Sequence, residues 1–204
     1  AEDIRYAEQL GYRIKLLGIT KRKADGIELR VHPTLIPAKR LIANVEGAMN
    51  AVLVQGDAVG ATLYYGKGAG AEPTASAVIA DLVDVTRMAT ADPENRVPHL
   101  AFQPDAVADI PVLPMAEVET SYYLRLRVED KPGVLADITR ILADQQISID
   151  AMIQREPGEG EMQTDIIMLT HVTRERQIDG AIASIEALPV VKRKVIRLRL
   201  EELG

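Results

Sequence analysis

The periodic patterns between residues 123 and 200 restrict the fold of this chain more than any other feature. Leu124, Leu126 and Val128 alternate with arginine, which predicts a half-buried strand. In order, the patterns indicate a strand at 123–128, a helix at 134–142, strands at 147–153 and 164–172, a helix at 178–185 and a strand at 190–200. This order predicts an α+β, ferredoxin-like βαββαβ fold, in which a four-stranded antiparallel sheet carries both helices on one face.

The other face of this sheet needs a partner of its own. Tyr123, Arg125 and the apolar run at 166–169 indicate that some surface or edge of the sheet pairs with a second copy of the chain. We therefore expect a homo-oligomer, at least a dimer. The alternative is that the sheet packs against the first half of the same chain.

The first 88 residues are typical of two β-hairpins framed by helices. A short helical pattern ends at Gly11, and an Asp25-Gly26 turn joins two strands. His32-Pro33 is expected to end the second of these strands. The predicted elements are strands at 12–23 and 27–31, a short helical piece within 41–50, strands at 51–55 and 60–65, and a helix at about 74–87.

A glycine-rich stretch at 66–78 follows the second hairpin. Gly66, Gly68 and Gly70 alternate with other residues and precede the helix, whose free N–H groups would suit a phosphate or carboxylate. The alternative is close packing of the backbone against the chain itself. A complete dinucleotide site would also need a strand–turn–helix unit followed by an acidic residue, which this stretch lacks. If it contacts a cofactor, most of that site lies elsewhere.

Five prolines interrupt residues 89–120 without any sustained periodicity, so we expect a linker there that packs along a surface. The expected domains are therefore 1–88 and 121–204.

Composition excludes several classes of function. The chain has 204 residues and a net charge of −6, which disfavours nucleic-acid binding. It lacks cysteine, which excludes disulfides, thiolate catalysis and cysteine-based zinc sites, and we expect no metal site. No apolar run is long enough to span a membrane, so we expect a cytoplasmic protein.

His32 could act as a general base, and Asp81 with Asp84 could form a carboxylate pair. A structural role for the histidine and a solvated helix face for the two aspartates explain these residues more simply.

The βαββαβ order, together with the sequence DKPGVLADITRILADQQISI, resembles the ACT domain, an amino-acid-sensing module. In that family the effector lies at the turn between the first strand and the first helix, held largely by backbone groups. The resemblance implies an effector site formed by Asp130, Pro132, Gly133, Val134, Leu135 and Ile149. The helix start offers N–H donors for a carboxylate, and Asp130 could oppose an ammonium group. The alternative is that Pro132 and Gly133 only terminate the strand.

The sequences RVHPTLIP, NVEGAMNAV, YYGKGAGAEPTASAV and SYYLRLRVEDKPGVLA, in this order, are similar to the bacterial homoserine dehydrogenase family over essentially the whole chain. Members reduce aspartate 4-semialdehyde to homoserine with NAD(P)H, on the route to threonine and methionine, and threonine is the usual feedback inhibitor. Their Rossmann domain and catalytic lysine have no counterpart here, so we expect a C-terminal portion that is inactive alone and holds no catalytic residue. Residues 1–88 would end the substrate and dimerisation domain, with Gly66, Gly68 and Gly70 lining the nicotinamide.

Two other hypotheses compete with this one. A freestanding regulatory protein would sense an amino acid through the ACT domain without catalysis, but it would not need the enzyme-like half at 10–85. A purely structural dimerisation module would bind no ligand.

Overall fold

The computed structural model describes residues 2–91, 104–155 and 160–203. The chain forms two compact units, one of Ala1–Ala43 with Pro111–Gly204 and the other of Asn44–Ile110. This division differs from the expected one at 88 and 121, because the first helix and hairpin belong with the C-terminal half. The twelve residues 92–103 of the expected linker lie outside the described residues.

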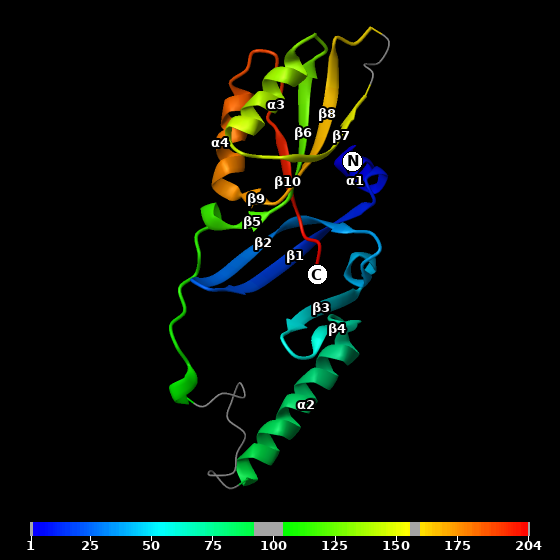
Figure 1. Cartoon of the computed structure of the whole chain (residues 1–204). Coiled ribbons are helices and arrows are strands. Elements are labelled where there is room, and N and C mark those ends of the chain that lie inside the picture. The colour runs from blue at the N-terminus through cyan, green and yellow to red at the C-terminus, as the bar shows by residue number, and fades with distance from the viewer. Residues whose placement is uncertain (1, 92–103, 156–159, 204) are drawn as a thin grey trace. The chain divides into compact units, whose positions relative to one another are not determined.

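The first unit contains the predicted βαββαβ arrangement (Figure 1). Its elements are β6 (Tyr122–Glu129), α3 (Val134–Asp144), β7 (Ile149–Gln154), β8 (Gln163–Thr170), α4 (Glu175–Glu186) and β10 (Ile196–Leu200). Strand β6 pairs antiparallel with β10 and β8, and β8 pairs antiparallel with β7. The fold class expected from the sequence is confirmed.

One face of this sheet is covered by α3 and α4. Alternate residues of β6 and β8, among them Leu124, Leu126 and Ile166, pack there against Ile138 and Ile178 of the helices. All five side chains are almost fully buried. The apolar side chains that recur at helical spacing in α3 thus form part of the main core of the unit.

A hairpin from the N-terminal part extends the sheet. Strands β1 (Tyr12–Lys23) and β2 (Gly26–Pro37) pair antiparallel, and β2 lies beside β10, so the sheet order is β1-β2-β10-β6-β8-β7. The prediction that His32-Pro33 ends the second strand was wrong, since β2 continues to Pro37. Strand β2 contacts β10 only at Thr34 and Leu35, so it is an edge strand at Pro33, where proline is tolerated.

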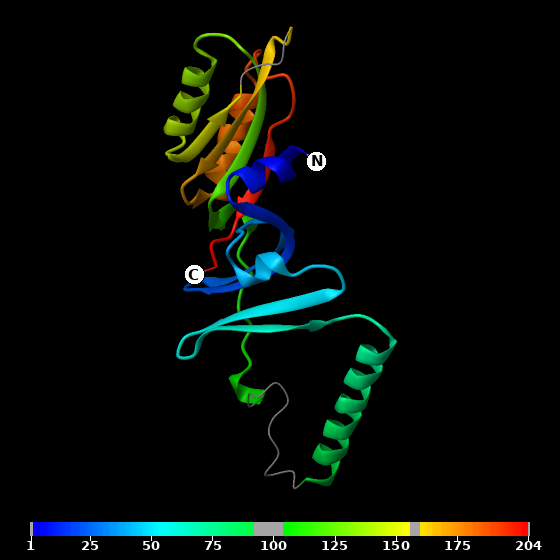
Figure 2. The same cartoon turned by 90° about the vertical axis from the view of Figure 1, so that its right-hand side faces the viewer.

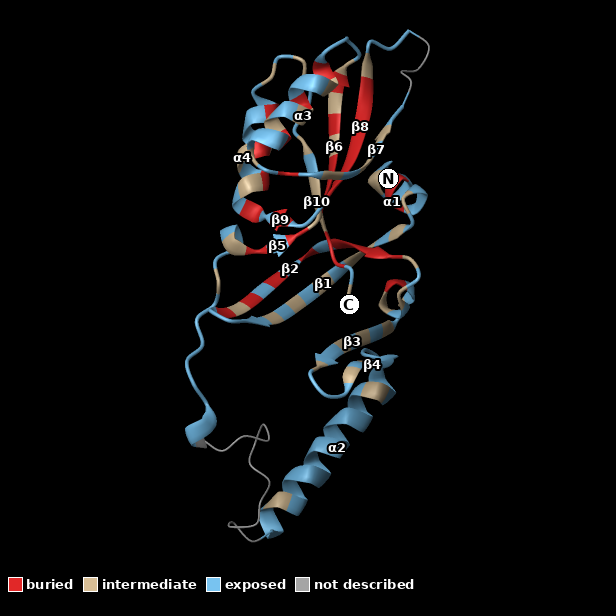
Figure 3. Ribbon diagram, viewed as in Figure 1, coloured by how far each residue is buried: buried red, intermediate tan, exposed pale blue. Residues whose placement is uncertain are grey.

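The polar side of β2 is the buried one. Leu29 and Val31 are 49% and 74% exposed, whereas Glu28 and Arg30 are 2% and 5% exposed. The reason is the C-terminal segment: Glu201 accepts a hydrogen bond of 2.9 Å from Arg30 Nη2 and lies within an ion-paired cluster on this side. The apolar alternation therefore correctly predicts a strand, but in this part of β2 the apolar side chains are on the exposed side (Figure 3).

Helix α1 (Glu2–Gln9) covers part of the sheet face opposite α3 and α4 (Figure 2). Tyr6 and Ala7 pack there against Tyr123, Ile167 and Leu169. This is the alternative in which the sheet packs on the first half of its own chain. Pairing with a second copy stays a prediction.

Residues 111–120 of the expected linker belong to the first unit. Val112 forms a bridge with Ile27, a 3-10 helix η5 (Met115–Glu117) follows, and β5 (Glu119–Thr120) pairs with β9 (Thr173–Arg174).

The second unit consists of one hairpin and one long helix. Strands β3 (Met49–Gly56) and β4 (Gly60–Lys67) pair antiparallel, as predicted, and α2 (Ala71–Thr90) follows β4. The 3-10 helix η1 (Leu41–Asn44) lies at the boundary between the two units. Pro73 lies in the first turn of α2, where its missing N–H breaks no helical hydrogen bond. No side chain of α2 is buried. Within the described ranges, no helix has the length and apolar character needed to cross a membrane.

Candidate functional site

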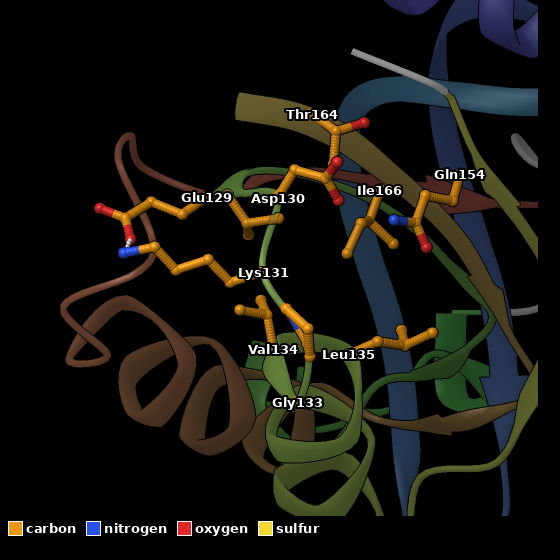
Figure 4. A pocket seen from close by; sticks show the side chains of 11 residues that line it. Glu129, Asp130, Lys131, Gly133, Val134, Leu135, Gln154, Thr164 and Ile166 are labelled. Carbon is orange, nitrogen blue, oxygen red and sulfur yellow. Dashed lines mark ion pairs between the residues drawn. The ribbon is translucent and has the colours of Figure 1, made fainter. Parts of the chain in front are cut away.

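A cavity of about 440 Å³ lies in the first unit where β6 ends and α3 begins (Figure 4). Its lining residues are Val128, Glu129, Asp130, Lys131, Pro132, Gly133, Val134, Leu135, Gln154, Thr164 and Ile166. The loop 129–133 and the first turn of α3 form one side, and the ends of β7 and β8 form the other.

Gly133 makes the sharp turn into α3 possible. Its φ of 91° and ψ of −23° are left-handed, a conformation that glycine adopts without the penalty of a Cβ atom. A Cβ atom at this position would meet no other atom within 4 Å. No side chain caps the helix, so the N-terminal end of α3 presents its partial positive charge to the loop, and Asp137 is the acidic residue of the first turn.

Ion pairs fix the outer rim of the cavity. The Glu129 carboxylate lies 2.5 Å from Lys131 Nζ and 2.5 Å from Lys192 Nζ, which comes from the connection between α4 and β10. The hydrogen bonds from Lys131 and Lys192 lower the pKa of Glu129 to about 2. Glu129 is therefore an anion at neutral pH that holds both lysines.

Asp130 is the second carboxylate of the cavity. Its backbone N–H donates to the carbonyl of Met162 at 3.0 Å, which fixes the loop against the start of β8. Its side chain is exposed and forms no ion pair within the described residues. This carboxylate is available to a cationic group of a ligand.

The inner wall is apolar. Val128, Val134 and Ile166 are all at most 6% exposed, and the hydroxyl of Thr164 donates to the carbonyl of Arg155. Gln154 adds an amide from the edge strand β7 (Figure 4). The cavity thus combines a helix N-terminus, a carboxylate and a short apolar wall, which suits a small zwitterion with an aliphatic side chain.

Five of the six residues predicted for the effector site line this cavity, namely Asp130, Pro132, Gly133, Val134 and Leu135. The structure does not bring Ile149 there. Ile149 is at the first position of β7, pairs with Thr170 and packs on the helix-side core, whereas only the last residue of β7 reaches the cavity. That a ligand binds these residues stays a prediction.

Three lining residues on β7 and β8 were not predicted: Gln154, Thr164 and Ile166. The strand register brings them to the loop, since Val128 pairs with Thr164 and Gln154 pairs with Ile166. The order of the strands alone leaves this register undefined, because a shift of one residue moves every side chain to the other face.

The three glycines of the second unit have different surroundings. A Cβ atom at Gly66 would meet nothing within 4 Å, whereas one at Gly68 would lie 2.4 Å from Asn50 Nδ2. Gly70 precedes α2 with a φ of 127°, and no side chain caps this helix. Packing within the chain therefore explains Gly68, while Gly66 and the start of α2 leave room for the close approach of an outside group.

The remaining titratable candidates have structural surroundings. His32 is buried, and its Nδ1 lies 3.0 Å from the hydroxyl of Thr34. Asp84 pairs at 3.6 Å with Arg87 on the exposed surface of α2, and Asp81 is exposed there too. Within the described part of the chain, no group of three histidine or acidic residues could hold a metal ion.

Comparison with known proteins matches residues 1–83 to the homoserine dehydrogenase family and residues 122–190 to the ACT domain. A homoserine dehydrogenase of Pseudomonas aeruginosa is 58% identical over 202 residues, 99% of this chain and 46% of the relative. One of Methylobacillus glycogenes is 62% identical over 192 residues, 94% of this chain and 45% of the relative. The chain thus spans about half the length of the curated relatives it matches.

Solved structures give the same result. A homoserine dehydrogenase from Thiobacillus denitrificans is 72% identical, with a TM-score of 0.91 over 100% of this chain and 46% of that one. A homoserine dehydrogenase of S. aureus is 26% identical, with a TM-score of 0.59 over 99% of this chain and 45% of the other.

Proposed function

We propose that this chain, which belongs to the homoserine dehydrogenase family and carries an ACT domain, is the amino-acid-sensing part of an NAD(P)-dependent oxidoreductase. The oxidoreductase would interconvert aspartate 4-semialdehyde and L-homoserine, and its effector would be L-threonine. A freestanding sensor is a poorer explanation, because it leaves the match of residues 1–83 unexplained.

The observation that carries this proposal is the position of the cavity within the ACT domain. It lies at the turn from the first strand to the first helix, where α3 begins without a side-chain cap. An amino-acid carboxylate would accept hydrogen bonds from N–H groups in the first turn of α3, because these groups have no carbonyl partner within the helix. Its ammonium group would face Asp130.

The lining also restricts the side chain of the effector. Glu129 pairs with both Lys131 and Lys192, and this carboxylate would compete with a second carboxylate on the ligand for the two lysines. The wall of Val128, Val134 and Ile166 favours a short aliphatic group, because burying its methyl groups there removes apolar surface from water. A small neutral amino acid such as threonine meets both conditions.

The second unit would contribute to the cofactor site. NAD(P)H supplies the hydride when bound, and the open space at Gly66 together with the uncapped start of α2 at Gly70 fits the approach of its nicotinamide end. These residues would hold the cofactor through the backbone alone. The groups that transfer the proton would come from the part of the enzyme not represented in these 204 residues.

Thermal unfolding in the presence of L-threonine tests the sensing role. A ligand at one hundred times its Kd stabilises the folded state by about 2.7 kcal/mol, which raises the Tm by several degrees. Asp130→Asn removes the carboxylate that would face the ammonium group, and we expect it to abolish most of the rise. Asp144→Asn, an equal charge change at the exposed end of α3, should leave the rise intact. Equal behaviour of both variants would contradict the site.

A further inference from the structure

Helix α1 is anchored by charged hydrogen bonds to the sheet face opposite the cavity. The Asp3 carboxylate accepts from Arg125 Nε at 2.7 Å, from Arg125 Nη2 at 3.1 Å and from the Tyr123 hydroxyl at 3.0 Å. Burial raises the pKa of Asp3, but the hydrogen bonds from Arg125 and Tyr123 outweigh it and leave the pKa below its ordinary value. A bidentate pair of this kind fixes both distance and orientation, so α1 is held to β6.

A second contact holds α1 to β8. The Tyr6 hydroxyl donates to Asp165 Oδ2 at 3.4 Å, and Arg127 Nη1 lies 3.6 Å from Asp165 Oδ1. The guanidinium of Arg155, just beyond β7, lies 5.0 Å from the centre of the Tyr6 ring. Asp165 is only 9% exposed. Helix α1 therefore depends on the positions of three neighbouring strands.

The same strands build the cavity from their other side. Thr164 and Ile166 line the cavity, and Asp165 between them contacts α1. On β6, Val128 lines the cavity while Arg127 contacts Asp165. Successive side chains of a strand point to opposite faces, so a displacement of the backbone at 164–166 moves the cavity wall and the α1 anchor together.

Helix α1 is the first element of the enzyme-like segment and leads directly into its hairpin β1–β2. Gly11, with a φ of 82°, joins it to β1, and the carbonyl of Gly11 accepts from the Ala38 N–H at 2.8 Å. The match to homoserine dehydrogenase covers residues 1–83 and so includes both α1 and the hairpin β1–β2.

We propose that occupation of the cavity is transmitted to the homoserine dehydrogenase-like segment through α1, with Asp165 and Arg125 as positioning residues. The proposal rests on the proposed function for the identity of the ligand. Because coupling between two sites is reciprocal, loosening α1 must weaken ligand binding by the factor by which the ligand strengthens the attachment of α1. Mutations in coupling elements typically change coupling by about 0.5–2 kcal/mol, or roughly two- to thirtyfold in affinity.

The test compares Asp3→Asn with Glu8→Gln by hydrogen–deuterium exchange and by calorimetric titration with L-threonine. Glu8 lies on the same helix, and its exposed side chain forms no ion pair with any described residue, so it is a matched control. Without ligand, Asp3→Asn should accelerate amide exchange in α1, and it should accelerate exchange in the loop 129–135 at least twofold. Glu8→Gln should leave the exchange rates of both segments unchanged. With L-threonine, Asp3→Asn should bind two- to thirtyfold more weakly.

Two results would overturn the proposal that α1 and the cavity are coupled. One is faster exchange in α1 with unchanged exchange at 129–135, and the other is unchanged exchange in α1 itself. If the wild-type chain binds no L-threonine, the proposed function fails, while the ligand-free exchange in the loop still decides whether α1 and the cavity are coupled.

Discussion

Replacing Gly133 by alanine separates backbone strain from ligand contact. Gly133 has a φ of 91°, and an L-residue in the left-handed region costs roughly 1–2 kcal/mol. Alanine also reduces the entropy of the unfolded chain, which offsets about 0.4–1 kcal/mol. A Cβ atom meets nothing within 4 Å, so no steric clash adds to this cost. We expect Gly133→Ala to lower the free energy of unfolding by about 1 kcal/mol, a Tm decrease of about 2–4 °C for a chain of this length.

Binding of L-threonine should decrease separately. The new methyl group enters open space beside the cavity, which the bound ligand would fill. An extra methyl group in a site that is already packed typically costs about 1–3 kcal/mol, or roughly five- to 150-fold in affinity. The assays are urea denaturation for stability and calorimetric titration for affinity.

Gly160→Ala is the matched control for this prediction. Gly160 has a φ of 81° and equally open surroundings, but it does not line the cavity. It should lose similar stability and keep its affinity for L-threonine. Unchanged affinity of Gly133→Ala, or an equal loss of affinity in both variants, would refute the reasoning that a ligand lies against this turn.

Three further predictions concern the buried polar groups and the activity. Tyr122→Phe should lower the free energy of unfolding by about 1.5–3 kcal/mol, because the buried hydroxyl donates to Glu175 at 2.6 Å; urea denaturation unchanged from wild type would contradict this. Burial, with further contributions from Arg199 and Arg30, lowers the pKa of His32 below 6.5, so the unfolded state binds more protons and stability falls as the pH drops through 6.5. His32→Gln should flatten this pH dependence, measured by urea denaturation at several pH values, and an unaltered slope would refute the assignment. The purified chain should form no NADPH from NADP and L-homoserine, and measurable turnover would show that it holds a complete active site.

The sequence predicts the fold of the C-terminal half well because its periods are regular. The alternation of Leu124, Leu126 and Val128 and the helical spacing around Ile138 each indicate one element and the side of it that is buried. The turn at Gly133 is equally clear, since Pro132 fixes its own φ and glycine permits the left-handed conformation that follows.

Two features could not be predicted from local patterns. Glu28 and Arg30 are buried because Glu201, 171 positions from Arg30, lies beside them, and no local period contains that contact. Gln154 reaches the cavity, and Ile149 does not, because of the register of β7 on β8. Both depend on contacts between segments far apart in the sequence.

The most direct test of the central claim is calorimetric titration of the chain with L-threonine, using L-methionine and L-homoserine as controls. We predict saturable binding of L-threonine at one site per chain, with weaker or no binding of the controls, because the cavity at the start of α3 offers a short apolar wall beside Asp130. Absence of heat with all three amino acids would contradict a complete sensor site in these 204 residues.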